Sequence, residues 1–388
     1  MVGSVSRAGQ SGPVIGVLGS YGGRNLGDEA ILTSLLADLR SRRPDARVIV
    51  FSRHPEHTIM AHDGVEVVGW EGVSRRQTSA IMHELDLLVL GGGGILYNTE
   101  ARRYLRLARA AQDLSVPVFT YALGAGPLTE EVDCALTREV LGAAVDVTVR
   151  DSESRLVLEE AGVTQPVVIT ADPALLLEPE PFGVEALRAE GVPTGRRLVG
   201  MSVREPGRAA EHLDVDGYHQ LLAQMGDFLV HRLDAQLLFI PMERDDIRHA
   251  HAVISRMTAA DQCRVLHGDY RPRQVLGLMR HLDLAVGMRL HFLIFAALAG
   301  VPFLPLPYAG KVFDFAQQTG APALLGVVRE ASGPLLAQVD QLWDERPSRT
   351  IQVAARLTEL RARAQVTGDR LGSVLDAVSP PRLARTSR

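Results

Sequence analysis

The sequence predicts an α/β fold with two doubly wound parallel-sheet domains and a cleft between them. Short apolar runs alternate with segments of helical spacing along most of the 388 residues, which is the pattern of parallel strands joined by crossover helices. Glycines follow several of the apolar runs, as at 91–94 and 124–126, where a buried strand turns toward a helix. The alternation stops once, at the proline- and glycine-rich segment 179–197, and then restarts. We therefore expect two Rossmann-like halves.

The first domain, expected over 13–178, begins with a βαβ unit. The apolar run 14–18 ends in glycines, apolar residues at helical spacing follow over 30–39, and a second apolar run lies at 47–51. The same pattern predicts five further strands, with helices between them, at 65–68, 87–90, 116–123, 145–149 and 167–170.

The second domain, expected over 198–378, follows the linker 179–197. A strand at 198–203, a helix near 215–233 and a strand at 236–240 open it. Three more short apolar runs predict strands at 264–266, 282–286 and 301–306, and the end of the domain, from about 332 to 377, has a helical pattern. Residues 1–12 and 379–388 are expected to form a flexible tail and a frayed tail.

The composition is that of an ordinary soluble globular protein. Hydrophobic residues make up 46% and charged residues 22% of the chain, so a large core can form. The net charge of −5 gives no support for nucleic-acid binding. Cys134 and Cys263 lack the spacing of metal ligands. The N-terminus lacks the apolar core of a signal peptide, and the most apolar run, 292–308, contains three prolines. We expect a cytoplasmic protein, and the sequence leaves peripheral membrane contact open.

The segment Gly287-Met288-Arg289-Leu290-His291 falls at a strand-to-helix junction in the second domain. Open α/β sheets bind ligands outside the carboxyl ends of their strands, and helix N-termini there attract anions. His291 could be a core histidine, but beside Arg289 we interpret it as a site residue. Lys311 follows the next strand and is the single lysine among 41 basic residues, which suggests that a compact ammonium is needed there.

Arg204 ends the first strand of the second domain, where a solvated side chain and an anion-binding one are both compatible with the pattern. Within Asn25-Leu26-Gly27-Asp28-Glu29, helix capping explains the two carboxylates about as well as a functional role does, and Asn25 is expected to face the cleft rather than only to cap the helix. Gly91–Gly94 contains more glycines than a tight turn needs, which favours a ligand-facing loop that includes Gly92 and Gly93. For Asp172-Pro173, a turn and a functional role both stay open.

Other site classes are not supported. The glycines of the first turn do not form G-x-G-x-x-G, and no acidic residue ends the second strand, which argues against a dinucleotide site. The sequence contains no P-loop and no nucleophile elbow. We expect neither a metal nor a cofactor.

In combination, these motifs resemble the polysaccharide pyruvyl transferase family, in particular its bacterial cell-wall branch. The matching segments occur in order between about residues 14 and 320: Tyr21-Gly22 with Asn25 to Leu32, Gly91 to Gly94, Gly124 to Pro127, Val149 to Ser154, Thr170 to Ala174, Gly287 to His291, and Tyr308 with Lys311.

This resemblance implies a GT-B-like fold and a transferase. Its donor would be phosphoenolpyruvate, used as a co-substrate, and the product a cyclic ketal of pyruvate on two hydroxyls of one sugar, with release of phosphate. The sugar would belong to a cell-surface polysaccharide or its lipid-linked precursor. The alternative is a GT-B glycosyltransferase that uses a nucleotide-sugar.

The resemblance also implies roles for individual residues. His291 would be the general acid/base, with Arg289 beside it, and Arg204, Arg289 and Lys311 would bind the donor. Tyr21, Asn25, Gly92, Gly93 and Asp172 would lie on the acceptor side, in the first domain.

Overall fold

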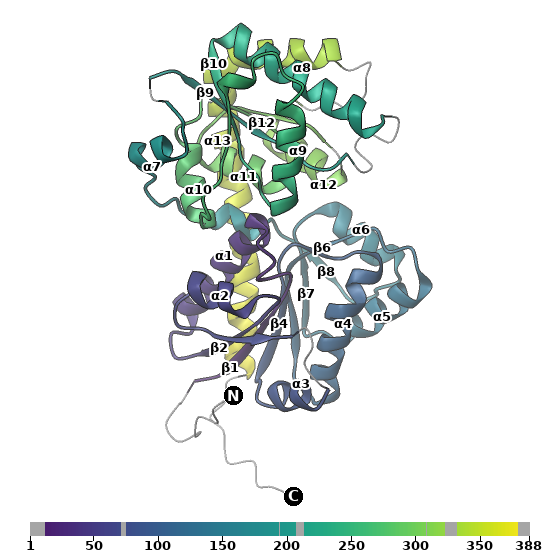
Figure 1. The fold of residues 1–388 in the computed structure, drawn as a ribbon. Coiled ribbons are helices and arrows are strands. Elements are labelled where there is room, and N and C mark those ends of the chain that lie inside the picture. The colour runs from purple at the N-terminus through teal and green to yellow at the C-terminus, as the bar shows by residue number, and fades with distance from the viewer. Residues whose placement is uncertain are drawn as a thin grey trace, which may run out of the picture. The chain divides into compact units, whose positions relative to one another are not determined.

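The computed structural model describes residues 12–70, 75–193, 195–206, 213–307, 309–322 and 332–378. The chain forms two compact units, each a parallel sheet flanked by helices (Figure 1). Unit 1 comprises Met1–Gly23, Ile31–Pro173 and Arg363–Arg388, and unit 2 comprises Arg24–Ala30 and Ala174–Ala362. Both expected tails lie almost wholly outside the described residues. Within the described ranges, no helix combines the length and apolar character needed to cross a bilayer.

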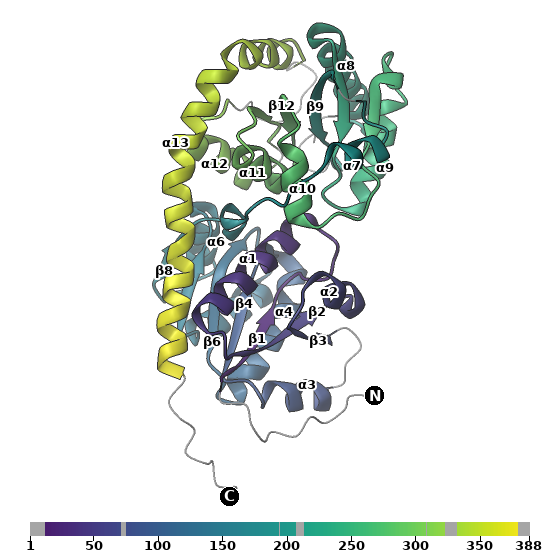
Figure 2. The same ribbon diagram turned by 90° about the vertical axis from the view of Figure 1, so that its left-hand side faces the viewer.

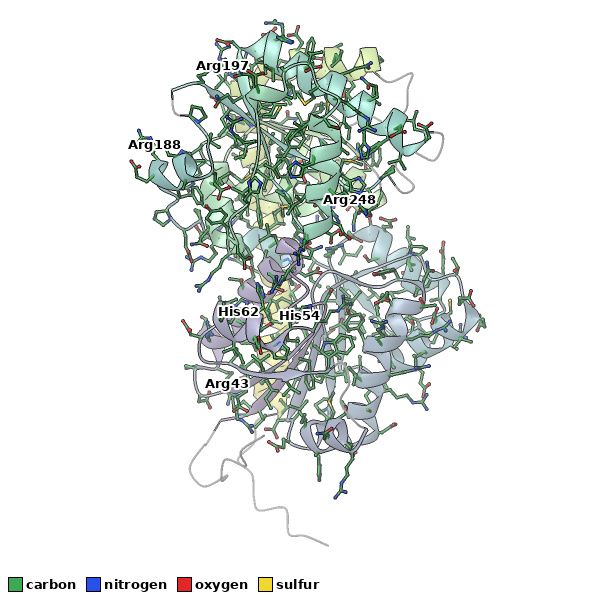
Figure 3. The ribbon with its side chains drawn as sticks, viewed as in Figure 1. Arg43, His54, His62, Arg188, Arg197 and Arg248 are labelled. Atoms are coloured by element: carbon green, nitrogen blue, oxygen red, sulfur yellow. The ribbon has the colours of Figure 1, made fainter. Side chains whose placement is uncertain are left out.

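The sheet of unit 1 has the strand order β3-β2-β1-β4-β6-β7-β8, with β5 paired to β6. Its strands are β1 (Val14–Leu18), β2 (Arg47–Ser52), β3 (Glu66–Gly69), β4 (Leu87–Gly91), β5 (Gly94–Leu96), β6 (Val118–Ala125), β7 (Asp146–Val149) and β8 (Val167–Ile169). Its helices are α1 (Leu26–Arg42, whose first residues, to Ala30, belong to unit 2), α2 (Pro55–Ala61), α3 (Arg75–Met82), α4 (Asn98–Asp113), α5 (Glu131–Gly142) and α6 (Ser152–Glu160). His54 and His62 flank the short α2 (Figure 3).

The strands of unit 1 are apolar on both faces, as a parallel sheet covered on both sides requires. Leu88 and Leu90 of β4 pack with α3, α4, α5 and α6. Leu87 and Val89 point the other way and pack with α1 and the end of α13 (Ser332–Val378). Adjacent residues of one strand therefore belong to opposite cores, which explains the continuous apolar run in the sequence.

Unit 2 contains a five-stranded parallel sheet of order β11-β10-β9-β12-β13. Its strands are β9 (Arg197–Ser202), β10 (Ala235–Phe239), β11 (Cys263–Val265), β12 (Leu284–Gly287) and β13 (Phe303–Pro305). Its helical segments are η1 (Pro173–Leu176, whose first residue belongs to unit 1), α7 (Val184–Ala189), α8 (Val215–Leu233), α9 (Arg244–Ile254), η3 (Ala260–Gln262), α10 (Pro272–Met279), α11 (Leu290–Leu298), α12 (Gly310–Thr319) and the first part of α13.

The first part of α13 is held in the core of unit 2. Leu335, Val339 and Trp343 pack with α8 and with β9 and β12. The guanidinium of Arg197, at the start of β9, lies 5.2 Å from the centre of the Trp343 ring (Figure 3). Pro347 lies inside this helix and cannot donate a backbone hydrogen bond, and Figure 2 shows that α13 changes direction along its length.

Every strand expected from the sequence is present, with ends that differ by at most a few residues. The domain limits differ more. The last part of α13 belongs to unit 1 because Leu371 and Leu375 are fully buried with α1, and because Arg370 donates to both carboxylate oxygens of Asp146. The second domain therefore does not run to residue 378 as expected.

Two further limits differ from the expectation. The expected linker 179–197 belongs to unit 2 and contains α7 and the first residue of β9. It is tied down by backbone bonds, such as that from Glu180 N–H to the carbonyl of Arg273 (2.9 Å). Residues Arg24–Ala30 also belong to unit 2, because the N–H of Leu26 donates to the carbonyl of Met242 (2.8 Å).

Candidate functional site

The carboxyl edge of the unit 2 sheet carries most of the predicted donor-site residues. The strand order reverses between β9 and β12, and ligands bind at such a switch point in open α/β sheets. Arg204 follows β9, Arg289 follows β12, and Lys311 follows β13 in the first turn of α12. The sequence therefore placed these three cations at one edge of one sheet.

Arg289 is buried and ion-paired. It precedes α11 with extended backbone, and only 8% of the residue is exposed. Its Nε lies 3.2 and 3.1 Å from the two carboxylate oxygens of Asp246, and its Nη2 lies 2.5 Å from Asp246 Oδ1. Nη2 also donates to Glu243. The guanidinium fork expected to face a donor is thus already engaged by protein carboxylates.

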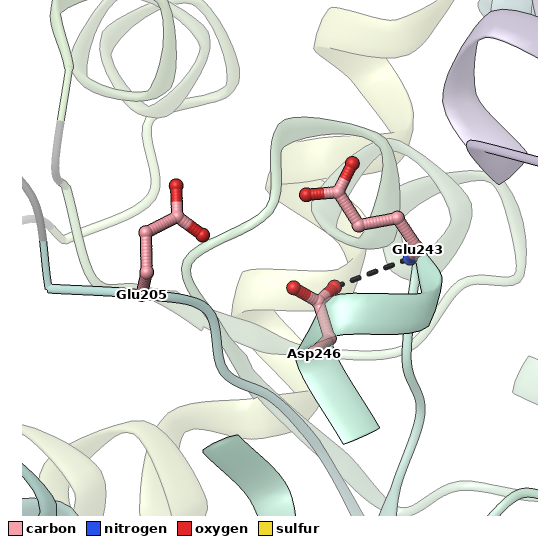
Figure 4. Close-up of side chains that lie close together, drawn as sticks. All are labelled: Glu205, Glu243 and Asp246. Atoms are coloured by element: carbon pink, nitrogen blue, oxygen red, sulfur yellow. Dashed lines mark hydrogen bonds between the residues drawn. The ribbon is translucent and has the colours of Figure 1, made fainter. Parts of the chain in front are cut away.

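Asp246 is fixed by backbone as well as by Arg289. Its Oδ2 accepts the N–H of Met242 (3.0 Å) and that of Glu243 (3.3 Å; Figure 4). Burial raises the pKa of the Asp246 carboxyl, and the nearby guanidinium of Arg289 opposes this increase. Asp246 anchors the start of α9 and the arginine at the same time.

A third carboxylate connects the two arginines. Glu205 is ion-paired to Arg204, and its Oε2 lies 3.8 Å from Nη2 of Arg289. Carboxylate oxygens of Glu205, Glu243 and Asp246 lie within 4.8 Å of one another (Figure 4). All three carboxylates pair with the guanidinium of Arg289, so an arginine already supplies the positive charge that a metal ion would bring.

The start of α1 joins this cluster. Asn25 Oδ1 accepts the N–H of Gly27 (2.9 Å), and Asn25 Nδ2 donates to Glu243 Oε2 (3.0 Å). Asn25 therefore caps its helix and also reaches the site, which were the alternatives raised by the sequence. A β-carbon added at Gly27 would overlap the imidazole of His291, so the ring lies directly against α1. Asn25, Arg289 and His291 come together in unit 2, although the sequence assigned Asn25 to the acceptor side.

Two buried histidines lie behind the site. His219 Nε2 and His249 Nδ1 are 3.0 Å apart, and 4% and 5% of these residues are exposed. Burial lowers the pKa of His219 to about 4 and also lowers the pKa of His249. The hydroxyl of the neighbouring Tyr218 donates a hydrogen bond to the carbonyl of Arg204 (2.8 Å). This bond connects α8, which carries His219, to the segment after β9.

In unit 1, Tyr21 and Gly92 are packing partners. Tyr21 is fully buried, and a β-carbon on Gly92 would overlap its hydroxyl. Gly92 and Gly93 have φ values of +80° and +74°, which favour glycine. The carbonyl of Gly93 accepts the N–H of Gly124 (2.9 Å). Packing and turn geometry thus account for Gly92, which the sequence had favoured as part of a ligand-facing loop.

Asp172, also predicted from the sequence, lies in a buried ion pair. Its Oδ2 accepts a hydrogen bond from Arg150 Nη1 at 2.9 Å, and only 7% of Asp172 is exposed. The guanidinium of Arg150 lies against Gly124, where a β-carbon would come within 2.8 Å of Nη2. Arg150 therefore links the last residues of β6 to the segment that follows β8.

The sequence did not point to Glu205, Glu243 or Asp246 as site residues, and for Arg150 it left a structural and a functional role equally open. Arg150 directly follows β7, and Glu205 and Glu243 lie in the segments that follow β9 and β10, as the predicted cations lie after their strands; that position was the available signal. Nothing in the sequence shows that Asp246 turns back toward Arg289, 43 residues away.

The two parallel-sheet α/β units form a GT-B-like fold. A family model of polysaccharide pyruvyl transferases matches residues 25–310, and the chain belongs to this family. It is a transferase of polysaccharide synthesis with a saccharide acceptor. The amylovoran biosynthesis protein AmsJ of Erwinia amylovora is 21% identical over 410 residues, which cover 92% of this chain and 99% of AmsJ.

Solved structures share the fold at low identity. HepE (Alr3699) of Anabaena, in complex with UDP, is similar with a TM-score of 0.64, 13% identity and coverage of 94% of this chain and 100% of its own. MnaA of S. aureus, also with UDP, gives a TM-score of 0.64 at 10% identity, with 95% and 98% covered. Heptosyltransferase II of E. coli gives a TM-score of 0.50 at 15% identity, with 86% and 99% covered.

Proposed function

We propose that the protein transfers the pyruvyl unit of phosphoenolpyruvate onto two hydroxyls of one sugar, forming a cyclic ketal and releasing phosphate. Membership of the pyruvyl transferase family supports pyruvyl transfer. One observation supports an anionic donor above all. Arg204 and Arg289 meet through Glu205 at the switch point of unit 2, and His291 lies in the first turn of the helix that follows Arg289.

The reaction balances without a redox partner or water. The methylene carbon of the donor takes a proton, and a first sugar hydroxyl adds to the neighbouring carbon. Phosphate then leaves with its bridging oxygen, and the second hydroxyl closes the ring. Of the two hydroxyl protons, one replaces the proton given to the methylene carbon and the other leaves with phosphate.

His291 is proposed as the general acid/base of this reaction. An imidazole has an ordinary pKa near neutrality and can both give and take a proton there. Its ring lies against Gly27 at the start of α1, so its position is limited on that side. The same contact brings it to the helix whose Asn25 reaches Glu243.

Arg204, Arg289 and Lys311 are proposed to bind the phosphate and carboxylate groups of the donor. Arginine can contact such groups with two parallel hydrogen bonds, and lysine acts as a point charge. The first turn of α11 begins directly after Arg289. Its backbone N–H groups and its positive dipole end would add to the attraction for phosphate.

For the acceptor, we propose the loops of unit 1 that contain Tyr21, Gly92, Gly93 and Asp172. Because Tyr21 and Asp172 are buried, their proposed role is to shape these loops rather than to contact sugar. The acceptor is proposed to be a cell-surface polysaccharide or its lipid-linked precursor, modified in the cytoplasm, at the inner face of the membrane when lipid-linked.

A glycosyltransferase that uses a nucleotide-sugar is the second candidate, because the UDP complexes of HepE and MnaA have similar folds. Those likenesses, at 13% and 10% identity, concern the fold alone. Such enzymes usually hold the ribose with an acidic residue late in the second domain, and Asp314 is the sole acidic residue in the twelve positions after Leu306.

The two functions predict different ligands. The melting temperature of the purified protein should rise with phosphoenolpyruvate and stay unchanged with UDP-, GDP- and ADP-sugars, because a ligand stabilises the native state to which it binds. A rise with a nucleotide-sugar and none with phosphoenolpyruvate would move the protein to the glycosyltransferase class.

A further inference from the structure

The three carboxylates around Arg289 differ in how firmly they are held. The side chain of Asp246 is 1% exposed, that of Glu243 31% and that of Glu205 41%. Asp246 accepts two backbone N–H groups in addition to the guanidinium. It cannot leave Arg289 without burying an uncompensated charge, which is strongly unfavourable.

Glu243 accepts the backbone N–H of Asp246 in the capping box at the start of α9, and it also accepts from two side chains. It follows β10 directly before α9, and its carboxylate accepts from Arg289 Nη2 on one oxygen and from Asn25 Nδ2 on the other. It therefore connects the start of α1 with the residue before α11. A rotation of this partly exposed side chain would release both side-chain donors, at the loss of the capping contact with the N–H of Asp246.

The local charge explains why one carboxylate has to move. Arg204 and Arg289 face Glu205, Glu243 and Asp246, so within this set of five described residues carboxylates outnumber guanidinium groups. A phosphate or carboxylate approaching Arg289 meets like charge at short range, which opposes binding. Of the two carboxylates that can move, Glu243 makes the direct contact with the guanidinium, whereas Glu205 already pairs with Arg204.

We propose that Glu243 occupies the position of the donor's anionic group on Arg289 and Asn25, and that the donor displaces it while Asp246 keeps the guanidinium in place. This inference rests on the proposed function for the identity of the donor. The chemistry of the displacement applies equally to a phosphate and to a carboxylate group. Glu243 would thus set the affinity for the donor, and Asp246 is a positioning residue for Arg289.

The test is the dissociation constant of inorganic phosphate, of pyruvate and of phosphoenolpyruvate, measured by calorimetry on the full chain. Glu243→Gln removes the competing charge and keeps the size of the side chain. It should tighten binding of phosphate or pyruvate roughly three- to ten-fold, as expected when an anion no longer competes with a partly exposed ion pair. Whichever of the two probes gains affinity identifies the group that meets Arg289. KM for phosphoenolpyruvate should fall by a similar factor.

Glu178→Gln is the matched control. Glu178 is an exposed glutamate of unit 2 that pairs with Arg361, and its substitution should leave all three constants unchanged. Asp246→Asn should act in the opposite direction and weaken anion binding. If that variant does not fold, Glu243→Gln in an Arg289→Lys background serves instead, and its gain in affinity should disappear.

The proposal would be overturned if Glu243→Gln bound neither phosphate nor pyruvate more tightly than the wild type does. An equal gain in affinity in the control Glu178→Gln would also overturn it, as would the absence of detectable binding in every variant. Failure of the proposed function has a different signature. In that case Glu243→Gln would still gain affinity for phosphate, whereas phosphoenolpyruvate would bind no better than phosphate and would not be consumed.

Discussion

The imidazole of His291 lies against Gly27, so that a β-carbon at position 27 would overlap Nδ1 and Cγ of the ring. Gly27 belongs to α1 and His291 to α11, and the two residues are 264 positions apart in the chain. Glycine at position 27 thus permits the close approach of a proposed catalytic histidine to a helix start.

Gly27→Ala should therefore displace His291. We expect transfer activity to fall on the order of a hundred-fold, since a displacement of about 1 Å in an active site can cost that much, while circular dichroism reports an intact fold. Gly142→Ala is the control, because nothing lies within 4 Å of a β-carbon there. Equal activity of the two variants would show that the position of His291 is not critical.

His291→Ala should separate binding from chemistry. With the general acid/base removed, turnover should fall at least a hundred-fold, whereas the dissociation constant of phosphoenolpyruvate should change little because the cations remain. Single-turnover kinetics and calorimetry measure the two quantities. Full activity of the variant would eliminate His291 as the acid/base.

Arg289→Lys should weaken both the donor site and the protein. A lysine cannot reproduce the contacts of Nε and Nη2 with both oxygens of Asp246. The loss of these charge-assisted bonds should cost roughly 1–3 kcal/mol of unfolding free energy in urea titrations. Affinity for phosphoenolpyruvate should fall as well, and a variant with wild-type affinity would remove Arg289 from the donor site.

The buried pair His219 and His249 predicts acid sensitivity. The unfolded chain protonates its histidines near pH 6.5, whereas His219 stays neutral in the fold down to a pKa of about 4. The stability contributed by neutral His219 is complete above pH 6.5 and is lost as the pH falls toward 4, at up to about 1.4 kcal/mol per pH unit. The lowered pKa of His249 acts in the same direction.

Urea unfolding at pH 7.5, 6 and 5 measures this loss. His219→Gln removes one titrating group, so its stability should depend less on pH than that of the wild type. His267→Gln, at a side chain that is 67% exposed, should keep the wild-type slope. Equal slopes for all three proteins would contradict the assignment.

The fold was largely predictable because its signals are local. Apolar runs such as Leu87–Leu90 and the glycines that end them mark buried parallel strands. The last part of α13 was assigned to the wrong unit because its helical pattern does not show which core Leu371 and Leu375 enter. The core that these two leucines enter is determined by their contact with α1, near the other end of the chain. A local sequence pattern contains no information about such a contact.

The positions of the three predicted cations could be read from the sequence, but their electrostatic surroundings could not. Arg204, Arg289 and Lys311 could be placed at one sheet edge because all three follow strands. That Arg289 would pair with Asp246 and Glu243 was not predictable, since side-chain pairing depends on how α9 starts after β10. Tyr21 and Asp172 match the family pattern, but the sequence could not show that both are buried.

The most direct test of pyruvyl transfer is the product itself. Phosphoenolpyruvate is incubated with the wild-type protein and a panel of aryl glycosides of common hexoses, and phosphate release and product mass are followed together. The account predicts one phosphate released per modified glycoside and a mass gain of one pyruvic acid less one water, as a ketal requires. Phosphoenolpyruvate left intact, with a sugar transferred from an added nucleotide-sugar to the same glycosides, would contradict it.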